Sequence, residues 1–373
     1  MILPEDKSAW EGYLSETLGK KVTLLSFSPL RREKGYEGGL GSPYVFVVKS
    51  DGIVEELIVK TSAPVFGLEN QEDRLRDSFW TYRTADLPGN AEVLGFGVTK
   101  GKKLINLKDA TESFVVSKRV KGTAYSDHLL NILNSKKLSQ DDITAAKNIS
   151  DRLVEIHSVK NESAEAANLY RRHIREAVGG HQGVAGVVDY IYRGIDEKTS
   201  KDKFGFDKKE LMKRLLELEK RSVDSSHRIK ESWQRCRRMH GDYHGYGNQI
   251  FAAYPDRLVL LDRSRAEFGE PADDFTATLI NFVDLAVRDE GKYSGNFEKL
   301  GKVFADNYLE KTKDYEMLTV VQPFFTWRGM VVMNPVWYPD KSVEVRSKLF
   351  NFVNNVSQVE EFDPKEINSY LSD

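Results

Sequence analysis

HGDYHGYGN, His240 to Asn248, gathers two histidines, an aspartate, an asparagine and three glycines into nine residues, in a chain with seven histidines altogether. His240 and His244 have the spacing of two zinc ligands on one helical turn. The glycines among them argue against a helix, because glycine is costly in a helix interior, and no glutamate stands where a zinc protease needs one. The stretch is therefore interpreted as a loop that presents polar side chains.

The residues after this loop predict a hairpin. Two short apolar runs, 249–254 and 257–261, flank a turn at Pro255-Asp256. Pairing across that turn places Asp262 opposite Gln249, next to the end of the loop.

This pairing predicts that Asp242, Asn248 and Asp262 converge. Two carboxylates and an amide are hard oxygen ligands of the kind that Mg²⁺ takes together with substrate phosphates. The alternative is a purely structural loop, in which His240 and Asp242 only brace a tight turn.

Composition excludes several classes of protein. The chain has 373 residues, of which 40% are hydrophobic. Its net charge of −2 is not the basic charge that nucleic-acid-binding proteins carry. Its single cysteine, Cys236, excludes an internal disulfide. No apolar run approaches the ~20 residues of a membrane span, and the charged start, residues 1–21, is unlike a signal peptide. These features predict a cytoplasmic protein that binds neither nucleic acid nor membrane.

The first ~100 residues are predicted to be strands around one or two helices. Residues 22–29 alternate in polarity, and residues 43–60 form two apolar runs split by Ser50-Asp51-Gly52, which favours a hairpin. The connection between these segments is rich in glycine and is either a flexible turn or a set of backbone N–H groups for a phosphate. Its glycines are Gly35, Gly38, Gly39 and Gly41.

Lys60 ends an apolar strand and needs a partner if it is buried. The following segment, residues 66–85, has helical periodicity and offers four acidic candidates, Glu69, Glu72, Asp73 and Asp77. Beyond Phe114 the chain has one more strand and then becomes mostly helical, with an amphipathic run at Ile143–Val159 and charged helices over residues 169–233.

Three motifs resemble the aminoglycoside phosphotransferase and choline kinase-like family, relatives of the protein kinases. HGDYHGYGN is similar to the family's H-G-D-x-H-x-x-N catalytic loop, and Leu261–Phe275 to its metal-binding aspartate with the G-D-P-x-x-D-L-type segment that follows. Leu153–Ser158 is similar to its L-x-x-L-H helix. The resemblance implies an α+β, bilobal protein kinase-like fold, with a small antiparallel β-rich N-lobe over residues 1–119 and a larger, mainly helical C-lobe over residues 120–373.

The resemblance also implies roles for individual residues. His240 and Asp242 form the catalytic pair, with Asp242 as the base that orients the acceptor hydroxyl, while Asn248 and Asp262 hold Mg²⁺. Asp274 matches a residue that braces the loop. Lys60 contacts the α- and β-phosphates and is held by Asp77, or alternatively by Glu72. The predicted nucleotide-binding set is Lys60, Asp77, Gly39, Gly41, Ser42, Ser117 and Val120, the last two belonging to the hinge.

The sequence departs from the family pattern in two features, a spacing and a single residue. Asp242 and Asn248 lie six positions apart, whereas the family has five, and Arg263 follows the metal aspartate directly. If the hairpin fixes Asn248, the extra residue bulges at Gly245-Tyr246 towards the acceptor. Tyr246 is then either an acceptor contact or a residue that packs on the C-lobe.

The implied activity is transfer of the γ-phosphate of ATP, with GTP not excluded, to a hydroxyl of a small molecule such as an aminoglycoside, an amino alcohol or a sugar. The alternative is a nucleotide-binding pseudokinase that acts as sensor or scaffold; a protein kinase is disfavoured, since no activation segment follows Asp262. The acceptor is expected between residues 169–233 and Phe324–Asp340, a segment that either lines a pocket or is core. Acidic lining suits a cationic acceptor, and arginines an anionic one, with Arg171, Arg172 and Arg175 as candidates. The identity of the acceptor and the oligomeric state stay open.

Overall fold

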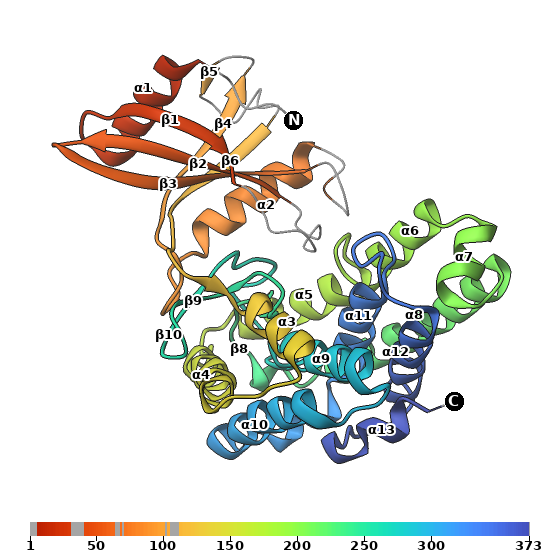
Figure 1. Cartoon of the computed structure of the whole chain (residues 1–373). Helices are drawn as coiled ribbons and strands as arrows, with labels where there is room; N and C mark the ends of the chain where they lie inside the picture. Colours follow the sequence, from red (N-terminus) through yellow and green to blue (C-terminus); the bar gives the residue numbers. More distant parts are fainter. Residues whose placement is uncertain are drawn as a thin grey trace. The chain divides into compact units, whose positions relative to one another are not determined.

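The computed structural model describes residues 6–30, 41–63, 68, 71–100, 103–104 and 112–372. The chain forms two compact units (Figure 1). The smaller consists of Met1–Lys121 together with Val259–Ser264, and the larger of Gly122–Leu258 and Arg265–Asp373. Residues 120–373 were predicted to form one lobe, and the return of Val259–Ser264 to the smaller unit is a difference from that prediction.

The smaller unit is built on an antiparallel sheet with the strand order β1-β2-β3-β6-β4-β5. Residues Asp51 and Gly52 both have positive φ, 50° and 81°, which is the geometry of a tight hairpin turn. The predicted hairpin is therefore confirmed. The strands are β1 (Thr23–Pro29), β2 (Gly41–Ser50), β3 (Ile53–Ser62), β4 (Val93–Lys100), β5 (Lys103–Leu104) and β6 (Glu112–Lys118).

Two helices accompany this sheet, α1 (Lys7–Leu18) and α2 (Gln71–Arg83). Helix α1 begins where the Asp6 side chain accepts hydrogen bonds from the Ser8 and Ala9 amides, and ends at Gly19 with φ 63°. Its apolar face buries Trp10 and Leu14 against Phe46 and other core residues of the strands. The predicted helix over residues 66–85 corresponds to α2.

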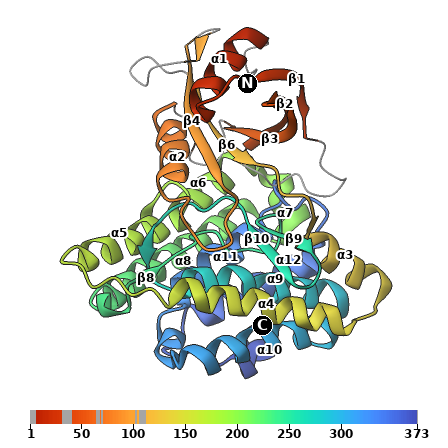
Figure 2. The ribbon, with the colours of Figure 1, turned by 90° about the vertical axis from the view of Figure 1, so that its left-hand side faces the viewer.

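The larger unit is mainly helical (Figure 2). Its helices are α3 (Tyr125–Ser135), α4 (Gln140–His157), α5 (Ala166–Gly179), α6 (Val184–Gly194), α7 (Glu197–Phe204), α8 (Lys208–Ile229), α9 (Ala272–Glu290), α10 (Gly295–Thr312), α11 (Gln322–Met333), α12 (Val343–Val356) and α13 (Ile367–Tyr370). Helix α9 is buried along almost its whole length and packs against α10, α11 and α12. The core of this unit is centred on α9.

Short strands frame the polar loop. They are β7 (Thr123–Ala124), β8 (Arg237–Arg238), β9 (Gln249–Ala253), β10 (Arg257–Leu260) and β11 (Phe268–Gly269). Strand β9 is hydrogen-bonded to β10 and β7, and β8 to β11. The predicted hairpin about Pro255-Asp256 is therefore confirmed as β9 and β10. In the described part of the chain, no helix has the length and apolar character to cross a membrane.

Candidate active site

The loop His240–Asn248 runs from β8 to β9 and is fixed at its start by Asp274, in the first turn of α9. The two oxygens of this carboxylate accept the backbone N–H groups of His240 at 2.7 Å and Gly241 at 2.8 Å. His157 Nε2, at the end of α4, lies 3.3 Å from the same carboxylate. The contacts confirm the predicted bracing by Asp274 and bring the three sequence motifs together.

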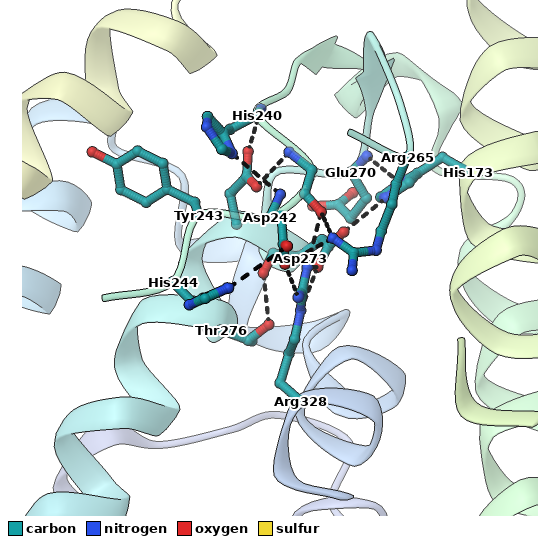
Figure 3. A network of polar contacts seen from close by, with 12 residues as sticks. His173, His240, Asp242, Tyr243, His244, Arg265, Glu270, Asp273, Thr276 and Arg328 are labelled. Atoms are coloured by element: carbon teal, nitrogen blue, oxygen red, sulfur yellow. Dashed lines mark hydrogen bonds and ion pairs between the residues drawn. The ribbon is translucent and has the colours of Figure 1, made fainter. Parts of the chain in front are cut away.

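His240 is fully buried. Its ring Nδ1 accepts the backbone N–H of Asp242 at 3.3 Å, and its ring meets that of Tyr243 edge-on at 5.6 Å. Figure 3 shows the imidazole turned back onto its own loop. This geometry suits the positioning of Asp242 rather than contact with a substrate.

The Asp242 carboxylate is held by cationic and polar side chains (Figure 3). Arg265 Nη1 and Arg328 Nη1 each lie 2.7 Å from its Oδ1, and His244 Nε2 lies 3.6 Å from Oδ2. Burial raises the pKa of the Asp242 carboxyl, but Arg265, His244 and Arg328 outweigh burial and hold that pKa well below its usual range. Asp242 is therefore ionised, although only 15% of its side chain is exposed.

Neither arginine was predicted. Arg328 lies in the apolar stretch FFTWRGM of α11, and a charged residue within an apolar helix is a signal for a buried partner. Arg265 lies near Arg263, the residue that departs from the family pattern. The sequence, however, does not show which of the two reaches the loop.

Asn248 closes the loop next to Asp242. Its Nδ2 donates to the backbone oxygen of Asp242 at 2.9 Å and to the Asp242 carboxylate at 3.2 Å. The predicted proximity of these two side chains is therefore found. Because the Asn248 amide nitrogen donates to Asp242, the amide oxygen is left to accept from another group or to bind a cation.

The extra residue of the loop folds inward. Tyr246 is buried, and its hydroxyl donates to Asp284 Oδ2 of α9 at 2.9 Å. The Gly245 N–H donates to Asn281 Oδ1 at 2.9 Å, and Lys341 forms an ion pair with Asp284. Of the two alternatives for Tyr246, packing on the helical part is the one that the structure shows. The aromatic segment over residues 324–340 likewise contributes mostly core, with Phe324, Phe325 and Trp327 buried.

Lys60 and Asp262 meet within the smaller unit, where Lys60 Nζ lies 2.6 Å from Asp262 Oδ1. Asp262 has φ 58°, a left-handed conformation that is uncommon outside glycine. The segment leading to it is fixed by backbone hydrogen bonds, from the Leu260 N–H to Gly89 at 2.9 Å and from the Ala91 N–H to Leu260 at 3.0 Å. Lys60 is therefore paired with one of the two predicted metal ligands.

The predicted partner of Lys60, Asp77, accepts a hydrogen bond from Ser62 at 3.1 Å. The side chain of Glu72, the alternative partner, lies outside the described residues. Arg263 is buried and donates to the carbonyl of Thr84, at the end of α2. This departure from the family pattern thus anchors the Asp262 segment to the smaller unit.

The remaining predicted nucleotide-binding residues lie on β2 and around β6. A Cβ added at Gly41 would approach Lys60 Cε to 2.5 Å, so glycine leaves room there for the lysine. Ser117 pairs with Ile58 and Val93 in the sheet, and Val120 follows β6. Gly39 and the side chain of Ser42 lie outside the described residues.

Within the residues that the structure describes, no three His, Cys, Asp or Glu side chains gather as a metal cluster. Mg²⁺ on a nucleotide does not require such a cluster, because it binds through one or two carboxylates, waters and phosphate oxygens. Asn248 and Asp262 supply oxygens of this kind, so their chemistry fits that ion.

Comparison with known proteins gives structural matches only. No family model and no curated protein matches the sequence. An aminoglycoside-3'-phosphotransferase of type VIII is 17% identical over 80% of this chain and 92% of its own, with a TM-score of 0.45. The ethanolamine kinase of Plasmodium vivax is 14% identical over 96% of this chain and 84% of its own, with a TM-score of 0.46. A glucosamine kinase in complex with glucosamine, ADP and inorganic phosphate is 11% identical over 99% of this chain and 82% of its own, with a TM-score of 0.36.

Proposed function

We propose that this protein is a small-molecule kinase that transfers the γ-phosphoryl group of ATP to a hydroxyl of its acceptor. The observation that supports the proposal most is the loop His240–Asn248, in which an ionised, nearly buried Asp242 is held by two arginines and lies next to the Asn248 amide. Phosphoryl transfer depends mainly on positioning and on neutralising charge. A carboxylate held in this way suits the task of orienting an acceptor hydroxyl.

Asp242 would accept a hydrogen bond from the acceptor hydroxyl and direct that oxygen at the γ-phosphorus. The new O–P bond forms as the bond between the γ-phosphorus and the bridging oxygen breaks, and ADP leaves. Because the pKa of Asp242 is held low, this carboxylate takes the hydroxyl proton only as the oxygen becomes bonded to phosphorus.

The nucleotide would be held by residues of the smaller unit. Lys60 would bind the phosphates, as its position at the end of an apolar strand suggests. Ser117 and Val120 would lie next to the base of the nucleotide. When bound through Asn248 and Asp262, Mg²⁺ would neutralise phosphate charge. In the described structure Lys60 is paired with Asp262 at 2.6 Å, so nucleotide and metal would have to replace that ion pair.

The ion pairs of Asp242 and Asp262 favour a second candidate function, that of a nucleotide-binding protein without phosphoryl transfer. Asp242 is engaged by two arginines and Asp262 by a lysine, which would keep both carboxylates from acceptor and metal if the contacts persisted with nucleotide bound. One experiment separates the two functions. Purified protein is incubated with Mg·ATP and a panel of aminoglycosides, amino alcohols, sugars and hydroxy acids, and phosphorylated products are sought by ³¹P NMR. A phosphorylated acceptor supports the kinase; nucleotide binding with no phosphorylated product supports the alternative.

A further inference from the structure

Arg328 joins the Asp242 carboxylate to a second buried carboxylate, that of Asp273. Its Nη1 donates to Asp242 Oδ1 at 2.7 Å, while Nε and Nη2 donate to Asp273 Oδ1 at 3.0 and 2.6 Å. Nη2 also donates to the backbone oxygen of Gly241 at 3.1 Å. All three guanidinium nitrogens are therefore engaged, and Figure 3 shows Arg328 between the two aspartates.

Asp273 is itself fixed. It is fully buried in the first turn of α9, and its Oδ2 lies 3.1 Å from His173 Nε2 of α5. The other ring nitrogen, His173 Nδ1, accepts the Glu270 N–H at 3.0 Å. A Cβ at Gly269 would lie 2.4 Å from the His173 ring, so glycine permits the ring to lie there. The contacts run from α5 through Asp273 and Arg328 to the loop.

We propose that Arg328 is a positioning residue for phosphoryl transfer: held by Asp273 and His173, it fixes the orientation of the Asp242 carboxylate. This inference rests on the proposed function. A guanidinium is a planar fork that binds two carboxylates in a fixed geometry, which the single ammonium group of a lysine cannot do. Arg265 reaches the same oxygen of Asp242 from a loop, whereas Arg328 reaches it from α11, where the whole residue is only 5% exposed.

The first test is chemical rescue. Arg328→Ala should lower kcat for ADP release from Mg·ATP by about 10²-fold, the order expected when a reacting group is misplaced by ~1 Å. The KM for ATP should change little, and added guanidinium ion should restore part of kcat. Arg328→Lys should stay impaired, because it keeps the charge but loses the fork.

The matched control is Arg346→Ala. Arg346 is also a buried arginine, but its guanidinium donates to backbone carbonyls, including that of Met333 at 3.0 Å. This variant should keep its kcat and show no rescue by guanidinium ion. A folded Arg328→Ala variant with unchanged kcat, or equal rescue of both variants, would overturn the proposal.

A second measurement does not need activity. Crystal structures of Arg328→Ala and of the milder Asp273→Asn should show the Asp242 carboxylate turned away from its wild-type orientation. An unchanged Asp242 rotamer in both variants contradicts the proposal, whether or not the wild type phosphorylates anything. Wild-type protein that binds Mg·ATP without transfer would instead refute the proposed function, while the orientation of Asp242 would still decide the role of Arg328.

Discussion

The Tyr246 hydroxyl donates a hydrogen bond of 2.9 Å to Asp284, so the loop His240–Asn248 is tied to the middle of α9 near its extra residue. Asp284 also pairs with Lys341, which directly follows the aromatic segment over residues 324–340. Three segments distant in sequence therefore meet at one buried carboxylate. Tyr246 consequently adds an anchor to the loop.

Tyr246→Phe should lower the free energy of unfolding. The change removes a buried hydrogen bond to a carboxylate, which is worth about 1.5–3 kcal/mol, and leaves the ring packing in place. Denaturant unfolding measures the loss. The control is Tyr192→Phe, whose side chain is exposed and whose effect should stay within ~0.5 kcal/mol. Equal stability of Tyr246→Phe and wild type would contradict the anchor.

Lys341 should make stability depend on pH in the alkaline range. Burial lowers its pKa from 10.5 to about 8, although Asp284 opposes this shift. Between these two values the unfolded chain holds more protons than the folded protein, so Lys341 makes stability rise with pH. The limiting slope is about 1.36 kcal/mol per pH unit.

The measurement is the difference in unfolding free energy between wild type and Lys341→Met, determined at several pH values from about 8 to 10.5. The difference should move in favour of the wild type as the pH increases. A difference that does not vary with pH would show that the pKa of Lys341 is the same in the folded and unfolded protein.

Lys60→Ala should weaken nucleotide binding with little effect on stability. The Lys60–Asp262 pair is partly exposed, with 35% and 42% of the two side chains accessible, and such pairs contribute about 0–1 kcal/mol. Binding of ATP by calorimetry and thermal unfolding are measured together. Lys20→Ala is a suitable control, because Lys20 pairs with Glu55 and its side chain is similarly exposed, at 36%. A Lys60→Ala protein that melts early yet binds ATP normally would make this lysine structural.

Much of the fold could be predicted, because turn residues and the periodicity of apolar residues indicate its hairpins and helices. The β2–β3 and β9–β10 hairpins follow from turn residues between apolar runs, and α4 from its amphipathic periodicity. The bracing by Asp274 and the contact between Asp242 and Asn248 were also expected, the first from a family motif and the second from the hairpin.

The surroundings of Asp242 could not be predicted in the same way. Arg328 lies 86 positions from Asp242 in the sequence, and nothing local indicates which buried partner an arginine in an apolar helix will find. The inward turn of Tyr246 was open for the same reason, since Asp284 lies 38 positions away. The ion pair between Lys60 and Asp262 depends on the return of Val259–Ser264 to the smaller unit, which a linear division of the chain does not show.

The most direct test of phosphoryl transfer by this protein compares wild type with Asp242→Asn, measuring ADP release from Mg·ATP in the presence of the acceptor panel together with ATP affinity. If Asp242 orients the acceptor, we expect acceptor-stimulated release by the wild type, a turnover lower by about 10²–10⁴ in the variant, and ATP affinities within a few-fold of each other. Equal turnover of the two proteins on the same acceptor would contradict it.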